Sequence, residues 1–126
     1  MQTGYEMYQR VQTETSSPAE LITLLYNALQ TDLQRAAAGL EAADHALVND
    51  RLGRAQEIVL ELLASLDLSY GDVPIRLSAL YEYLYQRLVA ANLHKDSAVV
   101  REVATIVQTL ADAWAYAARA AAGTGA

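Results

Sequence analysis

The 126-residue chain contains no cysteine, no phenylalanine and only two prolines. Without cysteine it can form neither a disulfide nor a thiolate-ligated metal site, which suits a reducing compartment. No apolar run approaches the roughly 20 residues that a membrane-spanning helix requires. Residues 1–10 lack the basic and apolar regions of a signal peptide. We therefore expect a cytoplasmic protein with a single domain and no membrane insertion.

Positive charge is also scarce, because Lys95 is the only lysine and the net charge is −6. Nucleic acids and anionic membranes are bound through clusters of basic residues, and the sequence contains no such cluster. Apolar residues nevertheless make up 53% of the chain. This composition argues against nucleic acid as a partner and favours a helical protein with apolar surface to spare.

Motifs for catalysis or metal binding are missing as well. His45 and His94 are the only histidines, and each has alanine three positions before it. The Glu-x-x-His motif of di-metal helical bundles is therefore absent. The chain also has no glycine-rich phosphate loop and no motif for a serine or cysteine nucleophile. We expect no enzyme activity, no cofactor and no bound metal.

Capping signals and helical periodicity predict four helices. The signals in chain order are the capping box Ser17-Pro18-Ala19-Glu20, a fading pattern at Asp44-His45, an N-cap at Asn49-Asp50, a break from Ser69 to Asp72, a start at Pro74, a cap at Asp96 or Ser97, and an end near Ala122-Gly123. The connections are short, which favours antiparallel neighbours. We predict an all-α fold, an antiparallel up-down four-helix bundle over residues 17–122, with a flexible N-terminal arm (1–16) and a frayed C-terminus (123–126).

Apolar residues at spacings of three and four give each helix a stripe that would face the shared core. The predicted core positions are Leu21, Leu24, Leu25, Ala28, Ala36 and Ala43, then Ala55, Ile58, Leu62 and Leu66, then Leu77, Leu80, Leu84, Leu88 and Ala91, and finally Val99, Val103, Ile106, Leu110, Trp114 and Ala117. Asp32 falls inside or beside the first stripe. It either pairs with Arg54, Arg87 or Arg101 on another helix or, as we expect, lies at the edge and reaches water.

Two further apolar rows lie beside these stripes. The first row includes Tyr26, Leu29 and Leu33, and the second consists of Tyr81, Tyr85, Val89 and Leu93. Any single member could wrap the edge of the core, but four helices of this size share only one interior. Both rows together are therefore difficult to bury, and exposed rows of this kind are typical of surfaces that bind a partner helix. Tyrosine suits such half-buried positions, because its ring is apolar and its hydroxyl needs a partner.

With the helices placed, the order of particular residues resembles the flagellar secretion chaperones, the FliS family, over nearly the whole chain. The matching pieces are Tyr8, Thr15–Leu21, Leu24–Asn27, Ala55–Val59, Glu61-Leu62, Leu66-Asp67, Leu80–Asn92, Asp96, Glu102-Val103 and Leu110–Trp114. The segment Leu80–Asn92, which reads LYEYLYQRLVAAN, is the most specific. Ala28 departs from the pattern, since the family often has glycine there, but this places no function in doubt.

The resemblance implies a cytoplasmic export chaperone for flagellin. Such a chaperone binds the disordered C-terminal region of flagellin, prevents premature polymerisation and delivers the subunit to a component of the flagellar export gate. It also implies that the N-terminal arm covers part of the binding surface when flagellin is absent. The expected partner-binding residues are Tyr8 and Val11 in the arm, then Tyr26, Leu29, Leu33, Tyr81, Tyr85, Val89, Asn92 and Leu93.

The oligomeric state that we expect is a monomer or a weak dimer. The alternative function is a structural helical bundle whose apolar rows form a homodimer or adaptor interface.

Overall fold

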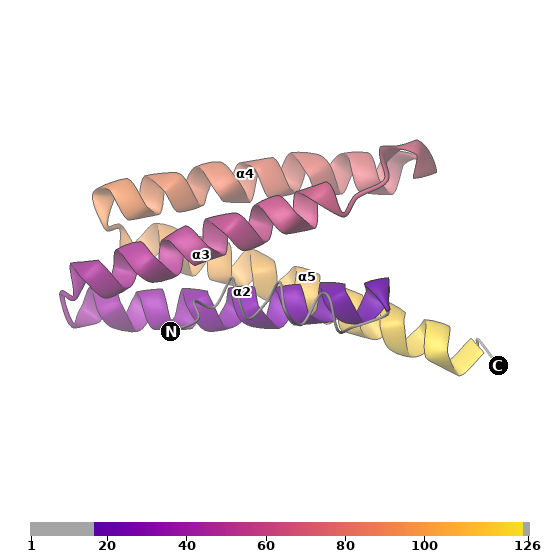
Figure 1. The fold of residues 1–126 in the computed structure, drawn as a ribbon, viewed down its shortest axis with the longest axis horizontal. Helices are drawn as coiled ribbons and strands as arrows, with labels where there is room; N and C mark the ends of the chain where they lie inside the picture. Colours follow the sequence, from indigo (N-terminus) through magenta and orange to yellow (C-terminus); the bar gives the residue numbers. More distant parts are fainter. Residues whose placement is uncertain (1–16, 125–126) are drawn as a thin grey trace.

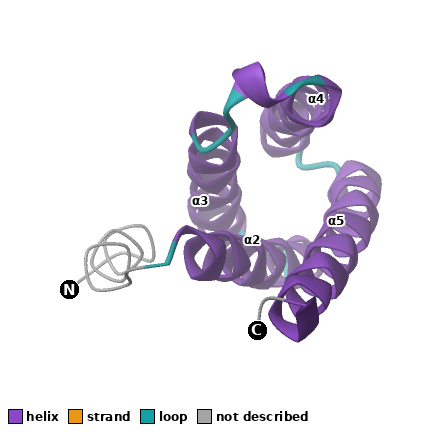
Figure 2. Ribbon diagram, turned by 90° about the vertical axis from the view of Figure 1, so that its right-hand side faces the viewer, coloured by secondary structure: helices purple, strands orange, loops and turns teal. Residues whose placement is uncertain are grey.

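The computed structural model describes residues 17–124 and arranges them as four long helices with one short 3₁₀ helix (Figure 1). The elements are α2 (Pro18–Glu41), α3 (His45–Ala64), η1 (Leu68–Tyr70), α4 (Asp72–His94) and α5 (Ser97–Thr124). Successive helices run antiparallel and pack side by side, and α5 closes the ring by packing on α2 (Figure 2). The predicted all-α four-helix bundle is confirmed, and residues 17–124 contain no strand. None of the helices in this range has the length and hydropathy that a membrane span requires.

Side-chain caps set the starts of α2 and α5 where the sequence predicts them. Ser17 Oγ accepts a hydrogen bond from the Glu20 amide at 3.3 Å, as a capping box requires. Asp96 Oδ1 accepts from the amides of Ala98 and Val99 at 3.0 and 3.4 Å. Asp96, rather than Ser97, is therefore the cap of α5.

The predicted start of the second helix at Asn49-Asp50 is wrong. Asp44 Oδ1 accepts a hydrogen bond from the Leu47 amide at 3.1 Å, and α3 begins at His45. Asparagine and aspartate are equally good N-caps, so local sequence does not choose between Asp44 and the pair Asn49-Asp50. Packing does, because Val48 is completely buried and belongs to the core side of the helix.

The third helix also begins earlier than predicted, at Asp72 rather than at Pro74. Proline is tolerated in the first turn of a helix, because its missing amide hydrogen would have no partner there. The segment before this helix, predicted as a break, contains the short helix η1. Gly71 joins η1 to α4 and has a φ of 104°. This left-handed backbone conformation favours glycine.

The core includes the row on α2 that the sequence placed beside it. Tyr26, Leu29 and Leu33 are 5%, 0% and 1% exposed, so the prediction that they lie on an open face is wrong. The physical reason is that α2 packs on both α3 and α5, and these two neighbours cover both apolar rows. Tyr81 of the second row is buried as well, at 3% exposure.

The other predicted core positions divide by their place along the bundle. The buried ones are Leu25, Ala36, Ala55, Ile58, Leu62, Leu84, Leu88, Ala91, Val99 and Val103. The half-buried ones are Leu21, Leu24, Ala28, Leu66, Leu77, Leu80, Ile106, Leu110 and Trp114, whereas Ala43 and Ala117 are exposed. Most of the half-buried positions lie near one end, where the core stops before the helices do.

At that end the last buried residues on the four helices are Leu25, Leu62, Tyr81 and Val107. Beyond them, neither residues 72–80 of α4 nor residues 108–123 of α5 include a buried side chain. Figure 2 looks onto this end, where α4 and α5 diverge from the turn that joins them at the far side. We call it the splayed end, made of residues 18–24, 63–80 and 108–123.

A pair of tyrosines closes the core where the splayed end begins. The hydroxyls of Tyr26 on α2 and Tyr81 on α4 lie 2.6 Å apart, so they connect helices that are not neighbours in the ring. Burial raises the pKa of both hydroxyls, and both therefore stay protonated at neutral pH. Each hydroxyl has one proton, and only one of the two protons is used in the shared hydrogen bond.

Asp32 is a buried member of the core and does not lie at its edge, as the sequence had suggested. Its side chain pairs with Arg51 of α3, and Arg51 Nη1 lies 3.2 Å from Asp32 Oδ1. Arg51 is not among the three predicted partners. Of those, Arg54 pairs with Asp50 and Arg87 with Glu102. Burial raises the pKa of the Asp32 carboxyl, although its hydrogen bond with Arg51 opposes the shift. The pair ties α2 to α3.

We expect Tyr26→Phe or Tyr81→Phe alone to lower the free energy of unfolding by about 1–2 kcal/mol, because each leaves a buried hydroxyl without its partner. The double variant removes both hydroxyls and should lose less than the sum of the two single losses. Urea denaturation followed by circular dichroism measures these values. Tyr116→Phe, at a position that is 71% exposed, is the control. Additive losses would contradict the coupling.

Candidate functional site

The accessible members of the second apolar row lie along one side of α4. Tyr85 is half-buried and packs against the core, Val89 is 38% exposed and Leu93 is 74% exposed. They recur at every fourth position and are therefore neighbours on the helix surface. Ile75 is 52% exposed and lies five helical turns before Leu93, on the same side.

Leu60 of α3 extends this surface onto the neighbouring helix. Lys95, just after α4, donates to Asn49 Oδ1 of α3 at 2.6 Å, which shows that the Asn49 edge of α3 faces α4. Leu60 lies about three turns after Asn49 and so belongs to the same edge, where it is 45% exposed. We call Leu60, Ile75, Tyr85, Val89 and Leu93 the α3/α4 face.

The three clustered tyrosines of α4 have three different surroundings. Tyr81 points into the core and meets Tyr26. Tyr83, on the opposite side from the α3/α4 face, donates to Glu102 Oε2 of α5 at 2.7 Å. Tyr85 alone lies toward α3 among apolar neighbours. The cluster is therefore divided among the core, the contact with α5 and the α3/α4 face.

Glu102 links α5 to α4 through two hydrogen bonds. Besides Tyr83, Arg87 Nε donates to Glu102 Oε1 at 2.8 Å. The hydrogen bond from Tyr83, followed by that from Arg87, lowers the pKa of the Glu102 carboxyl. The same contacts raise the pKa of Tyr83 and of Arg87. These three side chains hold the two helices together before they diverge toward the splayed end.

The splayed end presents a second set of apolar side chains. The exposed ones are Leu68, Tyr70, Val73 and Tyr116, together with Ile75, which also belongs to the α3/α4 face. Behind them lie half-buried side chains that pack against the core, among them Leu77, Leu110 and Trp114. Trp114 Nε1 also donates to Thr23 Oγ1 at 2.8 Å, which joins α5 to α2. Sequence analysis did not predict that Val73 and Ile75 are exposed apolar residues. Both stand beside Pro74 and outside the predicted core stripe of this helix, and this position could have indicated their exposure.

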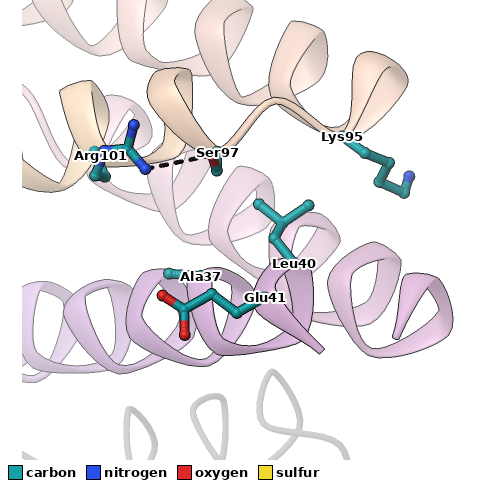
Figure 3. A pocket seen from close by; sticks show the side chains of 6 residues that line it. All are labelled: Ala37, Leu40, Glu41, Lys95, Ser97 and Arg101. Carbon is teal, nitrogen blue, oxygen red and sulfur yellow. Dashed lines mark hydrogen bonds between the residues drawn. The ribbon is translucent and has the colours of Figure 1, made fainter. Parts of the chain in front are cut away.

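A small pocket lies at the other end of the bundle (Figure 3). It has a volume of about 220 Å³ and is lined by Ala37, Leu40, Glu41, Lys95, Ser97 and Arg101. Its two cations already have partners, since Arg101 donates to Ser97 Oγ at 3.3 Å and Lys95 donates to Asn49 and Asn92. Within residues 17–124, no three His, Asp or Glu side chains are grouped so that they could hold a metal ion.

The remaining predicted residues have other positions. Asn92 is half-buried, and its Oδ1 accepts from Lys95 Nζ at 2.9 Å. Tyr26, Leu29, Leu33 and Tyr81 are inside the core and leave no surface for a partner in this conformation. Tyr8 and Val11 lie outside the described residues. Of the predicted set, the structure therefore leaves Tyr85, Val89 and Leu93 as an accessible group.

The fold and its accessible surfaces define a class of protein: a four-helix bundle with apolar faces that its own core does not cover. The family described as "Flagellar protein FliS" matches residues 1–121. The chain is 34% identical to the flagellar secretion chaperone FliS of Bacillus subtilis, covering 93% of this chain and 87% of the relative. Identity to the Salmonella typhimurium chaperone is 33% (88% and 87% covered), and to that of Escherichia coli 31% (88% and 86%).

The chain belongs to the FliS family of flagellar secretion chaperones. The resemblance carried by the segments around Leu80–Asn92 is thereby confirmed. A chaperone acts by binding another protein, so the accessible apolar surfaces, rather than the small pocket, are where its function is to be sought.

The lowered pKa of Glu102 gives a testable pH dependence. A carboxyl whose pKa is lower in the folded than in the unfolded protein stabilises the fold above its unfolded pKa, and this contribution disappears as pH falls through the folded pKa. We expect the parent to be more stable than Glu102→Gln at pH 7 and the difference to vanish in strongly acidic solution. Urea denaturation at several pH values measures it.

The matched control is Glu57→Gln, which removes an exposed carboxylate that has no ion pair within residues 17–124. It should show no comparable change with pH. A difference between parent and Glu102→Gln that stays constant from pH 7 to pH 3 would contradict the role of the Glu102 charge.

Proposed function

We propose that this protein is a cytoplasmic export chaperone that binds the C-terminal segment of flagellin. It prevents premature polymerisation and delivers the subunit to a component of the flagellar type III export apparatus. The observation that carries the proposal is the α3/α4 face, where Leu60, Ile75, Val89 and Leu93 remain accessible although the bundle already has a filled core. The relatives, which are named flagellar secretion chaperones, support the same function.

The dimensions of the α3/α4 face suit a helical guest. Ile75 and Leu93 are separated by five turns of α4, which is about 27 Å at 1.5 Å per residue. A guest helix of roughly 18 residues would match this length and could place an apolar side chain on the face at every turn. A segment that folds on binding must bury enough apolar area to exceed the free energy of its ordering, at about 25 cal/mol per Å².

Binding of this kind would also explain how polymerisation is prevented. The apolar side chains that a flagellin segment uses against the chaperone cannot at the same time contact another flagellin subunit. Because the segment would be held by exposed apolar contacts rather than by a closed cavity, it could be handed on without unfolding the bundle.

We expect Val89→Asp and Leu93→Asp each to weaken binding of the flagellin C-terminal segment by about 10-fold or more, since each places a charge where an apolar contact is lost. Both positions are exposed, so the far-UV circular dichroism spectrum should not change. Tyr85→Asp should also abolish binding, but Tyr85 packs against the core, which makes it the less specific test. Isothermal titration calorimetry measures the affinity.

The control variant is Gln34→Asp, which introduces the same residue on the exposed side of α2. Its affinity should equal that of the parent. Unchanged affinity in both Val89→Asp and Leu93→Asp would exclude the α3/α4 face. Light scattering over a range of concentrations tests the alternative, because a tight dimer that ignores the flagellin segment would favour a homodimer interface.

The N-terminal arm, residues 1–16, is proposed to act as a displaceable cover through Tyr8 and Val11. Deletion of residues 1–16 should then raise the affinity or the association rate for the flagellin segment, because the segment no longer competes with the cover. Stopped-flow association separates the two effects. Tyr8→Ser with Val11→Ser in the full chain should reproduce the deletion, whereas a lower affinity would show that the arm contacts the partner instead.

A further inference from the structure

The acidic side chains of residues 17–124 differ in whether they have a partner within this range. Most of the aspartates, together with Glu102, are engaged: Asp32, Asp50 and Glu102 pair with arginines, and Asp44, Asp67 and Asp96 cap helices. Glu57 and Glu82, in contrast, are exposed and make no hydrogen bond or ion pair with any residue between 17 and 124. These two carboxylates are therefore available to a partner.

Both of these glutamates border the α3/α4 face. Glu57 precedes Leu60 by three positions on α3, and Glu82 precedes Tyr85 by three and Val89 by seven on α4, so each lies one or two turns from an apolar member. Along the chain, Glu82 stands between Ile75 and Leu93. The apolar strip is therefore interrupted by negative charge near its middle.

Within residues 17–124, no lysine or arginine pairs with Glu57 or Glu82. Residues 55–64 of α3 and 77–86 of α4 contain neither lysine nor arginine. The arginines nearest in sequence have other partners: Arg51 pairs with Asp32 of α2, Arg54 with Asp50 of α3 itself, and Arg87 with Glu102 of α5.

A guest helix on the α3/α4 face would remove water from these carboxylates. Loss of hydration opposes binding unless the guest supplies a compensating partner. A lysine or arginine at the edge of the guest's apolar side would do so, and complementary charge also discriminates against acidic or neutral segments.

We propose that the α3/α4 face selects an amphipathic helical segment that carries lysine or arginine beside its apolar side, opposite Glu57 and Glu82. This inference rests on the proposed function, because the segment is taken to be the C-terminal region of flagellin. It adds the chemistry by which the face distinguishes its partner from other apolar helices.

The experiment compares the double variant Glu57→Gln/Glu82→Gln with the control Glu20→Gln/Glu41→Gln, which removes two exposed glutamates of α2 and so changes the net charge equally. The probes are the flagellin C-terminal segment of the same organism and a version in which its lysines and arginines are replaced by glutamine. Affinities are measured by calorimetry at low and at physiological salt, and circular dichroism verifies the fold of each variant.

The parent and the control should bind the natural segment roughly 2- to 10-fold more tightly than the glutamine version at low salt, as expected for two solvent-exposed ion pairs. Glu57→Gln/Glu82→Gln should lose this discrimination, and its affinity should change less with salt. Equal discrimination by the double variant and the control would overturn the inference while leaving the proposed function intact. Failure of the parent to bind either segment would overturn both.

Discussion

The fold depends on one geometric constraint: four helices of this length share a single interior, and here that interior is shorter than the helices. It ends at the buried hydroxyl contact between Tyr26 and Tyr81. Up to that level the ring is filled by aliphatic side chains, and the Asp32–Arg51 pair holds α2 against α3. Beyond it, α4 and α5 diverge and their apolar residues remain half-buried or exposed.

The same constraint separates the accessible apolar surface from the core. Along α4, successive sides of one helix face the interior, α5 and the α3/α4 face, as Tyr81, Tyr83 and Tyr85 demonstrate. The side next to α3 has no further neighbour in the ring, so its apolar residues stay accessible. One helix therefore contributes both to the core of the bundle and to an accessible apolar surface.

Sequence patterns predicted the number of helices, their class of fold and the family, because capping residues and helical periodicity are local signals. They did not resolve which apolar row on α2 faces inward. Both rows are apolar, and only the positions of α3 and α5 decide that Tyr26, Leu29 and Leu33 are covered. The partner of Asp32 was wrong for a related reason, since it depends on the register of α3 against α2. On α4, Val89 and Leu93 could be predicted because no neighbouring helix covers that side.

The single tryptophan of the chain has an optical consequence. Trp114 is half-buried at the splayed end, and its indole nitrogen donates to Thr23 across the contact between α5 and α2. The tryptophan fluorescence of this protein, excited selectively at wavelengths that tyrosine does not absorb, therefore arises from one known location, far along α5 from Glu102. Its emission wavelength reports the hydration of that contact. To first order, it does not respond to a change in solvent exposure beside Leu93, at the opposite end of the molecule.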